Sequence, residues 1–219
     1  SGLIIRLKLN QGHQQAIAFG LKYISNFVNG NHKIIVMDCD GEDTPMSAKV
    51  LAKEISKNDV DVVVAKRDKR SEALLFKLFY AIYKLIFLFL TGRKIDFGNF
   101  LILQEQSISR LILMPQLTTH LAATVISSGL RIQKIPINRG KRYAGESKMN
   151  FFSLTLHGFR ALMVFTEEVL VRVGTVCIFI AICAAIFSII VVVLKIIGFS
   201  SPGWFSIALG ILLLIMLQT

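Results

Sequence analysis

Two aspartates separated by one residue follow an apolar run early in the chain. The run KIIVM over 33–37 is typical of a short buried strand, and Asp38-Cys39-Asp40 comes directly after it. Carboxylates just beyond the carboxyl end of a buried strand stand at the crevice where α/β sheets bind ligands. Two of them can share a hard divalent cation, which in turn neutralises a diphosphate. A solvated acidic turn is the alternative, but the position after the strand favours a ligand site.

Basic residues gather in two clusters, KRDKR at 66–70 and RGKR at 139–142, with Lys148 close behind the second. A solvated basic face, or attraction to anionic lipid headgroups, would explain both clusters without any chemistry. The more specific hypothesis is phosphate binding, because arginine presents a fork of N–H donors that matches phosphate oxygens. In the segment RYAGESK that begins at Arg142, the glycine permits a tight loop, and Ser147 and Lys148 can donate to the same anion.

Histidine and cysteine patterns add little chemistry. The four histidines have no partner visible in the sequence, and we expect each to be exposed or satisfied by its surroundings. The three cysteines are too few for a disulfide scaffold and lack the spacing of a zinc site. These features predict a reduced protein that faces the cytosol.

Charge is distributed very unevenly along the chain. After Gly174 the only charged residue is Lys195, so residues 1–174 hold 24 of the 25 basic and all 14 acidic residues and carry +10 of the formal +11. Hydrophobic residues make up 53% and the mean hydropathy is +0.60, which excludes a disordered chain and disfavours a purely soluble one. We expect the basic part to face water and the rest to lie in a membrane. Nucleic acid would suit the charge but not the membrane segment, so no nucleic-acid partner is expected.

The membrane part contains two apolar runs. Residues 175–194 form a stretch of 20 residues without a charge, enough to cross a hydrocarbon core of about 30 Å as a helix. Turn residues follow at 198–203, and a second apolar run begins at Trp204. The pattern predicts a hairpin of two transmembrane helices, over 175–197 and 203–219, with the second one incomplete. Both ends of the hairpin return to the side of the basic domain, which marks that side as cytoplasmic.

The water-facing part alternates between strand and helix patterns. This predicts an α/β domain with a mostly parallel sheet over residues 1–150. Helices are expected at 10–28, 46–56, 107–113 and 118–128. Strands are expected at 3–9, 33–37, 61–65, 100–103 and 131–137.

Two further segments predict helices that lie in the plane of a membrane surface. Residues 73–90 are intensely apolar, yet Lys77, Tyr80 and Lys84 share one helical side, where they can reach the lipid headgroups. A third membrane span is the alternative, and it is disfavoured because it would bury both lysines. Residues 151–174 are assigned to an amphipathic interfacial helix that leads into the first span, because polar residues recur there at three- and four-residue steps.

Together these segments resemble a known enzyme family. MDCDGEDTP after a strand, NQGH opening a helix, DFGNF, RGKRYAGESKMN and two terminal apolar runs are similar to the family 2 glycosyltransferases that act on polyprenyl phosphates. These are the dolichol-phosphate-mannose synthase-like and bactoprenol glucosyltransferase-like enzymes, and the resemblance covers nearly all of residues 7–219. It implies a GT-A fold and an inverting transfer of a sugar from a nucleotide-sugar donor to a polyprenyl phosphate acceptor. A multi-pass protein of the plasma membrane with a cytoplasmic catalytic domain would carry out this reaction.

The resemblance implies roles at the donor side of the site. Asp38 and Asp40 correspond to the residues that hold Mg²⁺ or Mn²⁺ on the nucleotide-sugar diphosphate, and Asp40 is the one on which catalysis is expected to depend. Glu42 stands where the family often has a glutamine ligand. A metal site of Asp38, Asp40 and Glu42 is therefore expected.

The resemblance also implies roles at the acceptor side. Arg67 corresponds to an arginine that binds the acceptor phosphate. Arg142, Ser147 and Lys148 correspond to the loop that closes over the phosphates. Asp96 is retained as a catalytic candidate, either as a weak base or as a positioning residue.

The chain departs from the family pattern at three places, one of which is the incomplete second span. The family sequence GDFR appears as GNFL, so Asn99 replaces a carboxylate that can contribute a base or an acceptor contact, and we assign Asn99 to substrate binding. A phosphate monoester is largely dianionic near neutral pH, since its second pKa is about 6, and can attack without a strong base. The loss therefore favours a phosphate acceptor. The family's opening strand, which holds the nucleotide base, has no counterpart, so the chain is expected to lack that strand.

Two other functions stay open from the sequence. The first is a transferase that extends a glycan or another hydroxyl acceptor. The second is a membrane scaffold that retains the fold without turnover. The identity of the sugar and the nucleotide, and self-association into a homo-oligomer, stay open as well.

Overall fold

The computed structural model describes residues 2–27, 32–57, 59–67, 74–138, 140–144, 151–199, 201 and 203–219. For residues 67, 74–78 and 151 it describes the main chain. The chain forms two compact units, Ser1–Phe165 and Thr166–Thr219. The first unit is an α/β domain, as predicted, and the second consists of helices.

The first unit is built on a mixed sheet. In the described part of the chain, the strands β1 (Lys33–Val36), β2 (Val62–Arg67), β3 (Phe97–Gln104) and β4 (Ile132–Ile137) lie in the order β1-β3-β2-β4. β3 runs antiparallel to both neighbours, and only β2 and β4 pair in parallel. The prediction of a mostly parallel sheet is therefore wrong.

The direction of β3 follows from the path of the chain between β2 and β3. The connection contains the helix α3 (Leu74–Thr91) and returns to the edge where β2 ends, so that Lys66 pairs with Phe97. The beginning of β3 and the ends of the other three strands therefore meet at one edge of the sheet. Side chains near residues 38, 66 and 96–99 are brought to this edge.

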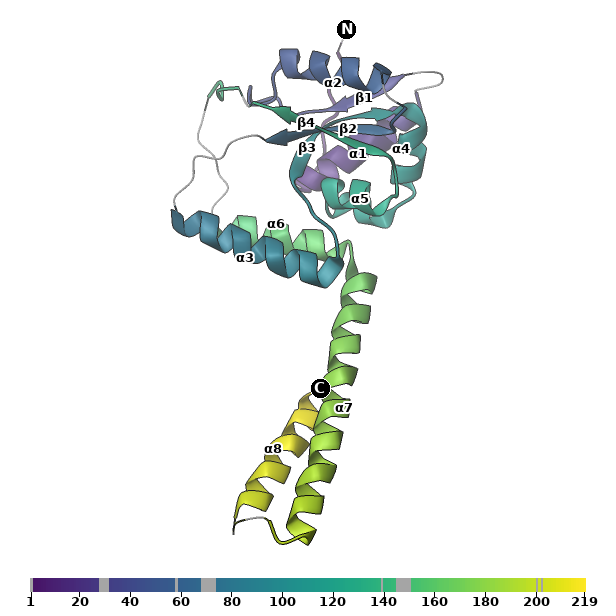
Figure 1. Cartoon of the computed structure of the whole chain (residues 1–219). Helices are drawn as coiled ribbons and strands as arrows, with labels where there is room; N and C mark the ends of the chain where they lie inside the picture. Colours follow the sequence, from purple (N-terminus) through teal and green to yellow (C-terminus); the bar gives the residue numbers. More distant parts are fainter. Residues whose placement is uncertain are drawn as a thin grey trace. The chain divides into compact units, whose positions relative to one another are not determined.

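The sheet separates two layers of helices (Figure 1). The helices α1 (His13–Ser25), α4 (Glu105–Ile112) and α5 (Leu121–Ser127), with the 3-10 helix η1 (Pro115–Thr118), cover one face, and α2 (Pro45–Lys57) covers the other. Successive strand residues alternate between the two faces. Val62, Val64, Leu101 and Leu103 belong to the core beneath α1, whereas Val63, Phe100 and Ile102 pack with Leu51 and Ile55 of α2.

Residues 3–9 do not form the predicted strand. Their backbone pairs with none of the described strands, and Leu3, Ile4 and Leu9 are exposed. The prediction of a strand over 3–9 is therefore wrong. The other predicted strands are confirmed, and β3 begins three residues earlier than the expected 100–103.

The helices α3 and α6 (Phe151–Met163) lie side by side in the first unit (Figure 1). The Tyr83 hydroxyl donates to the Gly158 carbonyl at 3.1 Å, and a Cβ at position 158 would lie 2.8 Å from the Tyr83 ring. Phe87 and Phe165 pack edge to face with ring centroids 5.9 Å apart. The outer surfaces of both helices expose large apolar side chains: Phe79, Ile82, Leu85, Ile86 and Phe89 on α3, and Phe152, Leu156, Phe159 and Met163 on α6.

The single interfacial helix expected over 151–174 is divided between two helices, α6 and the first turns of the helix that begins at Thr166. The chain turns after Met163, where the Val164 and Phe165 amides donate to Ala161 and Leu162, and the Phe165 side chain is fully buried. Burial of this aromatic ring stabilises the turn and ends the helix. The polar periodicity continues through the turn, so the sequence pattern did not reveal it.

The second unit contains α7 (Thr166–Ile196) and α8 (Trp204–Gln218), and α8 lies alongside α7 (Figure 1). Lys195 on α7 places its Nζ atom 4.1 Å from the centre of the Phe205 ring on α8. Among the described residues, α7 alone is long and apolar enough to cross a membrane. Its first turns carry Glu167, Glu168 and Arg172, so the helix begins well before the charge-free stretch at 175–194.

Candidate functional site

The loop after β1 holds the three predicted metal ligands in a tight turn. The backbone N–H of Glu42 donates to Asp40 Oδ1 at 3.0 Å, and the backbone N–H of Asp38 donates to Asp43 Oδ2 at 2.9 Å. Gly41 has a φ of 94°, which a residue with a side chain rarely adopts. The turn brings the Asp40 and Glu42 carboxylates to one side.

Arg142 lies against these two carboxylates. Its Nη2 atom is 3.0 Å from Asp40 Oδ2 and 3.3 Å from Glu42 Oε1, and its Nε atom also donates to Glu42 Oε1 at 3.3 Å. The Arg142 side chain is 29% exposed, which reduces screening by water. The structure thus joins a predicted phosphate ligand to two predicted metal ligands.

Close backbone contacts hold the two loops together. The Gly140 N–H donates to the Glu42 carbonyl at 2.9 Å, and the Tyr143 N–H donates to the Asp40 carbonyl at 2.8 Å. A Cβ at Gly140 would lie 2.4 Å from the Gly41 carbonyl oxygen, and one at Gly41 would lie 2.9 Å from the Tyr143 ring. Both glycines are required for this approach.

His13 and Gln14 join the site, although sequence reasoning assigned neither a role. His13 Nε2 lies 3.6 Å from Asp38 Oδ1 and 2.9 Å from Asn99 Nδ2. Gln14 Nε2 donates to Asn99 Oδ1 at 3.2 Å, and its own Oε1 accepts the Leu121 N–H at 2.7 Å. The register of the sheet explains the contact, since Val36 pairs with Leu101 and so brings residue 99 beside residue 38. The polar segment NQGHQ at the start of a helix was the sequence feature that could have indicated a role for His13 and Gln14 in the site.

Asp96 lies at the same edge of the sheet between two lysines. Its Oδ1 is 2.6 Å from Lys134 Nζ, and its Oδ2 is 3.3 Å from Lys66 Nζ. Burial raises the pKa of the Asp96 carboxyl, but the hydrogen bonds and charges of Lys134 and Lys66 outweigh burial and hold that pKa below its usual value. A carboxylate stabilised in this way is a weak base. Asp96 is better placed to hold the ammonium groups of Lys66 and Lys134 in position.

The other predicted phosphate ligands are Arg67, Ser147 and Lys148. Arg67 is the last residue of β2 and pairs with Ile137 of β4, so its main chain reaches the edge of the sheet that carries the site. Ser147 and Lys148 lie outside the described residues.

Two histidines pack beneath this region. The rings of His120 and His157 have centroids 4.3 Å apart. His120 caps α5 by accepting the Ala123 N–H at Nδ1, and it is only 4% exposed. Burial lowers the pKa of His120 to about 3, helped by repulsion from His157 when that ring is protonated, and burial lowers the pKa of His157 as well. Both are therefore neutral near neutral pH.

The carboxylates suit a hard cation in type, but Arg142 takes up part of their capacity. Asp38 and Asp40 offer oxygen donors, and their side chains are 35% and 30% exposed. Within the described ranges, no group of three or more His, Cys, Asp or Glu side chains is arranged to hold a metal ion. The oxygen donors are of the type that Mg²⁺ or Mn²⁺ prefers, but they do not converge on one point as placed, and binding of an ion would have to displace Arg142 from Asp40.

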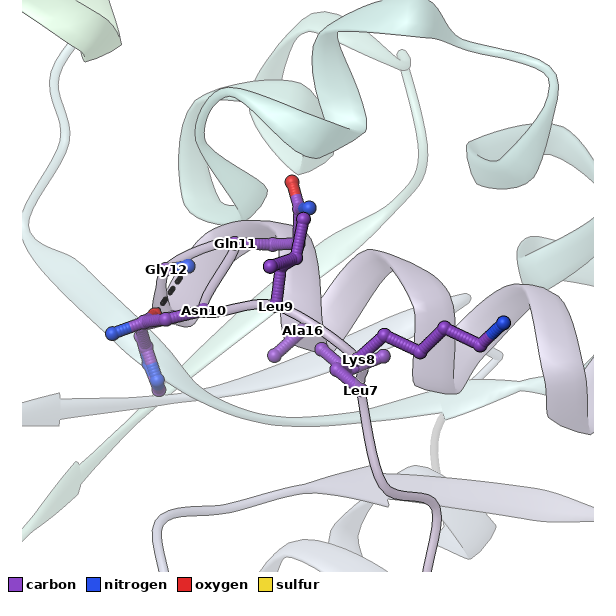
Figure 2. A pocket seen from close by; sticks show the side chains of 8 residues that line it. Leu7, Lys8, Leu9, Asn10, Gln11, Gly12 and Ala16 are labelled. Carbon is purple, nitrogen blue, oxygen red and sulfur yellow. Dashed lines mark hydrogen bonds between the residues drawn. The ribbon is translucent and has the colours of Figure 1, made fainter.

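Residues at the start of α1 and just before it line a pocket of about 470 Å³, and Figure 2 shows this lining. Its lining consists of residues 7–13 and Ala16, and the Asn10 side chain accepts the Gly12 N–H at 3.0 Å. Asn10 thereby shapes the turn that leads into α1. His13, which lies 3.6 Å from Asp38, is part of this lining.

A match to a known protein family covers the part of the chain that contains most of these site residues. Residues 3–105 match the family Glycosyl transferase family 2. No curated protein matches the chain. The matched segment includes His13, Asp38, Asp40, Asp96 and Asn99, whereas Arg142 lies beyond it. The matched segment is 103 of the 219 residues, and over it the chain is similar to the family 2 glycosyltransferases.

Proposed function

We propose that the protein is a membrane-anchored inverting glycosyltransferase that moves a sugar from a nucleotide-sugar to polyprenyl phosphate. The observation that carries the proposal is the meeting of Arg142 with Asp40 and Glu42 at the sheet edge of a family 2 domain. In this reaction the nucleotide diphosphate and the acceptor phosphate lie close together, and positive groups must neutralise the charge of both. The two carboxylates would hold a metal ion that binds the diphosphate, and Arg142 would bind the acceptor phosphate beside it.

The donor side rests on the acidic loop. Asp38 and Asp40, with Glu42, are the residues that would hold Mg²⁺ or Mn²⁺. The ion would supply charge neutralisation to the departing nucleotide diphosphate. Asp40 is the residue whose loss should cost most, because it contacts both Arg142 and the Glu42 amide.

The acceptor side rests on the basic residues. Arg142, with Arg67, Ser147 and Lys148, would bind the lipid phosphate in line with the anomeric carbon of the sugar. One phosphate oxygen forms the new bond to that carbon, and the bond from the carbon to the nucleotide diphosphate breaks, with inversion. A phosphate dianion needs no strong base for this attack, so positioning and charge neutralisation carry the catalysis. The paired Asp96 would serve by orienting Lys66 and Lys134.

The membrane part of the proposal rests on three observations. The helix α7 has the length and composition of a span. The helices α3 and α6 expose large apolar side chains such as Phe89 and Phe159, as expected of interfacial helices whose apolar faces enter the lipid. All but one of the charged residues lie in residues 1–174. We propose a second span at α8 and a catalytic domain on the cytoplasmic side of the plasma membrane.

The test uses the chain in membranes with radiolabelled UDP-glucose or GDP-mannose. One arm receives undecaprenyl or dolichyl phosphate, and a second arm receives oligosaccharide acceptors. Label that enters the organic phase in the first arm alone supports the proposal. Transfer to the oligosaccharides alone would favour a glycan-extending enzyme, and no transfer despite retained nucleotide binding would favour a scaffold. The Asp40→Asn variant serves as the inactive control.

A further inference from the structure

Gln14, on the first turn of α1, forms two hydrogen bonds that fix the orientation of its amide. The backbone N–H of Leu121 can only donate, so the atom that receives it at 2.7 Å must be the Gln14 oxygen. The Gln14 NH₂ group therefore faces Asn99 and donates to Asn99 Oδ1 at 3.2 Å. Gln14 is only 6% exposed, so water does not compete for these bonds.

The orientation of the Asn99 amide in turn determines which hydrogen bond the His13 ring forms. Because Asn99 Oδ1 accepts from Gln14, the Asn99 NH₂ group faces His13 and donates to Nε2 at 2.9 Å. A ring nitrogen that accepts a hydrogen bond carries no hydrogen, so the neutral His13 ring carries its hydrogen on Nδ1. A backbone N–H at the start of α5 thus selects the tautomer of a histidine beside Asp38.

His13 lies beside the acidic loop that follows β1. Its Nε2 atom is 3.6 Å from Asp38 Oδ1, and its side chain is 55% exposed. Among the described residues the Nδ1 atom has no hydrogen-bond partner, so this N–H is available as a donor. The ligand it suits is rich in acceptors, and phosphate oxygens are such acceptors.

We propose that Gln14 and Asn99 are positioning residues that hold His13 in the Nδ1–H form, and that this N–H donates to a phosphate oxygen of the nucleotide-sugar diphosphate. The inference rests on the proposed function and adds a donor contact to it. It also gives Asn99 a role of its own. An aspartate at position 99 would offer only acceptors, and would leave His13 Nε2 without the donor that Asn99 supplies.

The tautomer can be measured without any activity. The chain contains four histidines, so ¹⁵N-histidine labelling of the full chain in detergent micelles gives few imidazole signals in long-range ¹H–¹⁵N spectra. The His13→Gln variant assigns the His13 signal. At about pH 8, where histidine is ordinarily neutral, we expect the Nδ1–H pattern. An Nε2–H pattern in the unaltered chain overturns the inference.

Variants of Gln14 test the positioning. Gln14→Glu keeps the acceptor for Leu121 but removes the donor to Asn99, so the Asn99 amide should turn over and His13 should change to the Nε2–H form. Gln15→Ala, at the next position of the same helix, should leave the His13 pattern unchanged. A Gln14→Glu variant that is folded and keeps the original pattern would show that Gln14 does not set the tautomer.

Binding of magnesium pyrophosphate, measured by calorimetry, tests the contact itself. His13→Ala and Gln14→Glu should weaken binding about tenfold, the usual cost of losing a hydrogen bond to a charged group, and Gln15→Ala should not. In turnover, the donor KM should rise while the acceptor KM stays constant. Equal pyrophosphate affinity in all variants overturns the contact. If the tautomer and the binding behave as expected but no nucleotide-sugar is turned over, the proposed function fails and the positioning of His13 stands.

Discussion

The Nη2 atom of Arg142 lies 3.0 Å from the Oδ2 atom of Asp40, so a group suited to phosphate and a group suited to a metal ion neutralise each other. The same Nη2 atom lies 3.3 Å from the Oε1 atom of Glu42. A divalent cation at Asp40 would compete with Arg142 for the same oxygens and would free the guanidinium for an anion. Under the proposed function, metal binding and phosphate binding should therefore be linked at this site.

Replacement of Asp40 by asparagine should abolish most of the transfer activity. The change keeps the size of the side chain and removes its charge, which weakens both the proposed ion site and the contact with Arg142. We expect turnover to fall by about 100-fold or more, the scale seen when a preorganised electrostatic contact is lost. Turnover is measured with and without Mn²⁺, with expression and membrane insertion as controls. Near-normal activity would remove Asp40 from the metal site.

Replacement of Arg142 by alanine should weaken use of the lipid-phosphate acceptor. A charge-assisted contact is worth about 1.5–3 kcal/mol, which corresponds to about 10- to 100-fold in kcat/KM for the acceptor. Arg142→Lys should restore only part of this, because the fork geometry is lost. The neighbouring exposed Lys141→Ala is the matched control. If the Arg142→Ala enzyme has unchanged acceptor kinetics, Arg142 does not bind the acceptor and serves only to hold the two loops together.

Replacement of Gly140 by alanine should separate the two loops without removing any functional group. The added Cβ would lie 2.4 Å from the Gly41 carbonyl oxygen and 2.7 Å from Thr44 Cγ2, so the backbone must shift. We expect at least about a tenfold loss of activity, because small misplacements of binding groups are costly. Gly20→Ala, which has open space around it, is the control. Equal activity of the two variants would show that the loop contact is dispensable.

Acid should destabilise the first unit through His120. Its pKa is about 3 in the folded chain and about 6.5 when unfolded, so between these values the unfolded chain binds more protons. The stabilising contribution is present above about pH 6.5 and is lost as pH falls toward 3. His120→Asn keeps a good N-cap acceptor and does not titrate. Its melting temperature should therefore fall less steeply than that of the unaltered chain.

The matched control for this experiment is His32→Asn, which replaces a histidine whose side chain is 63% exposed. His157, which packs on His120, is retained in every variant, so the difference between the curves reports His120. Thermal unfolding of the full chain in detergent is followed from pH 7.5 to pH 4.5. Parallel curves for His120→Asn and the unaltered chain would contradict the prediction.

An interfacial position of α3 predicts that both of its flanks lie on one side of the membrane. Cysteines introduced at Lys57 and Lys94, before and after α3, should react with an impermeant reagent only from the cytoplasmic side. The native Cys39 is exposed beside Asp40 and marks the side of the site. Cys177 and Cys183 are replaced by alanine in this background. Labelling of positions 57 and 94 from opposite sides would show that α3 crosses the membrane, and a single site of acidic loop and Arg142 would then be impossible.

Local pattern was enough to predict much of the fold. The apolar run before Asp38 predicted β1, the run DVVVA predicted β2, and their period-two burial follows from strand geometry. The uncharged run after Gly174 likewise predicted the apolar part of α7. These features depend on residues that are neighbours in sequence, so the sequence alone determines them.

The arrangement of the site was decided only by the tertiary structure. The reversed direction of β3 depends on how the chain returns after α3, and this direction brings Asn99 beside Asp38. The contacts of Arg142 with Asp40 and of Gln14 with Leu121 join residues about a hundred positions apart. No local periodicity encodes such pairs, because each requires two separately formed elements to pack on the same core. The sequence therefore determined which groups are available for chemistry, and packing decided which of them meet.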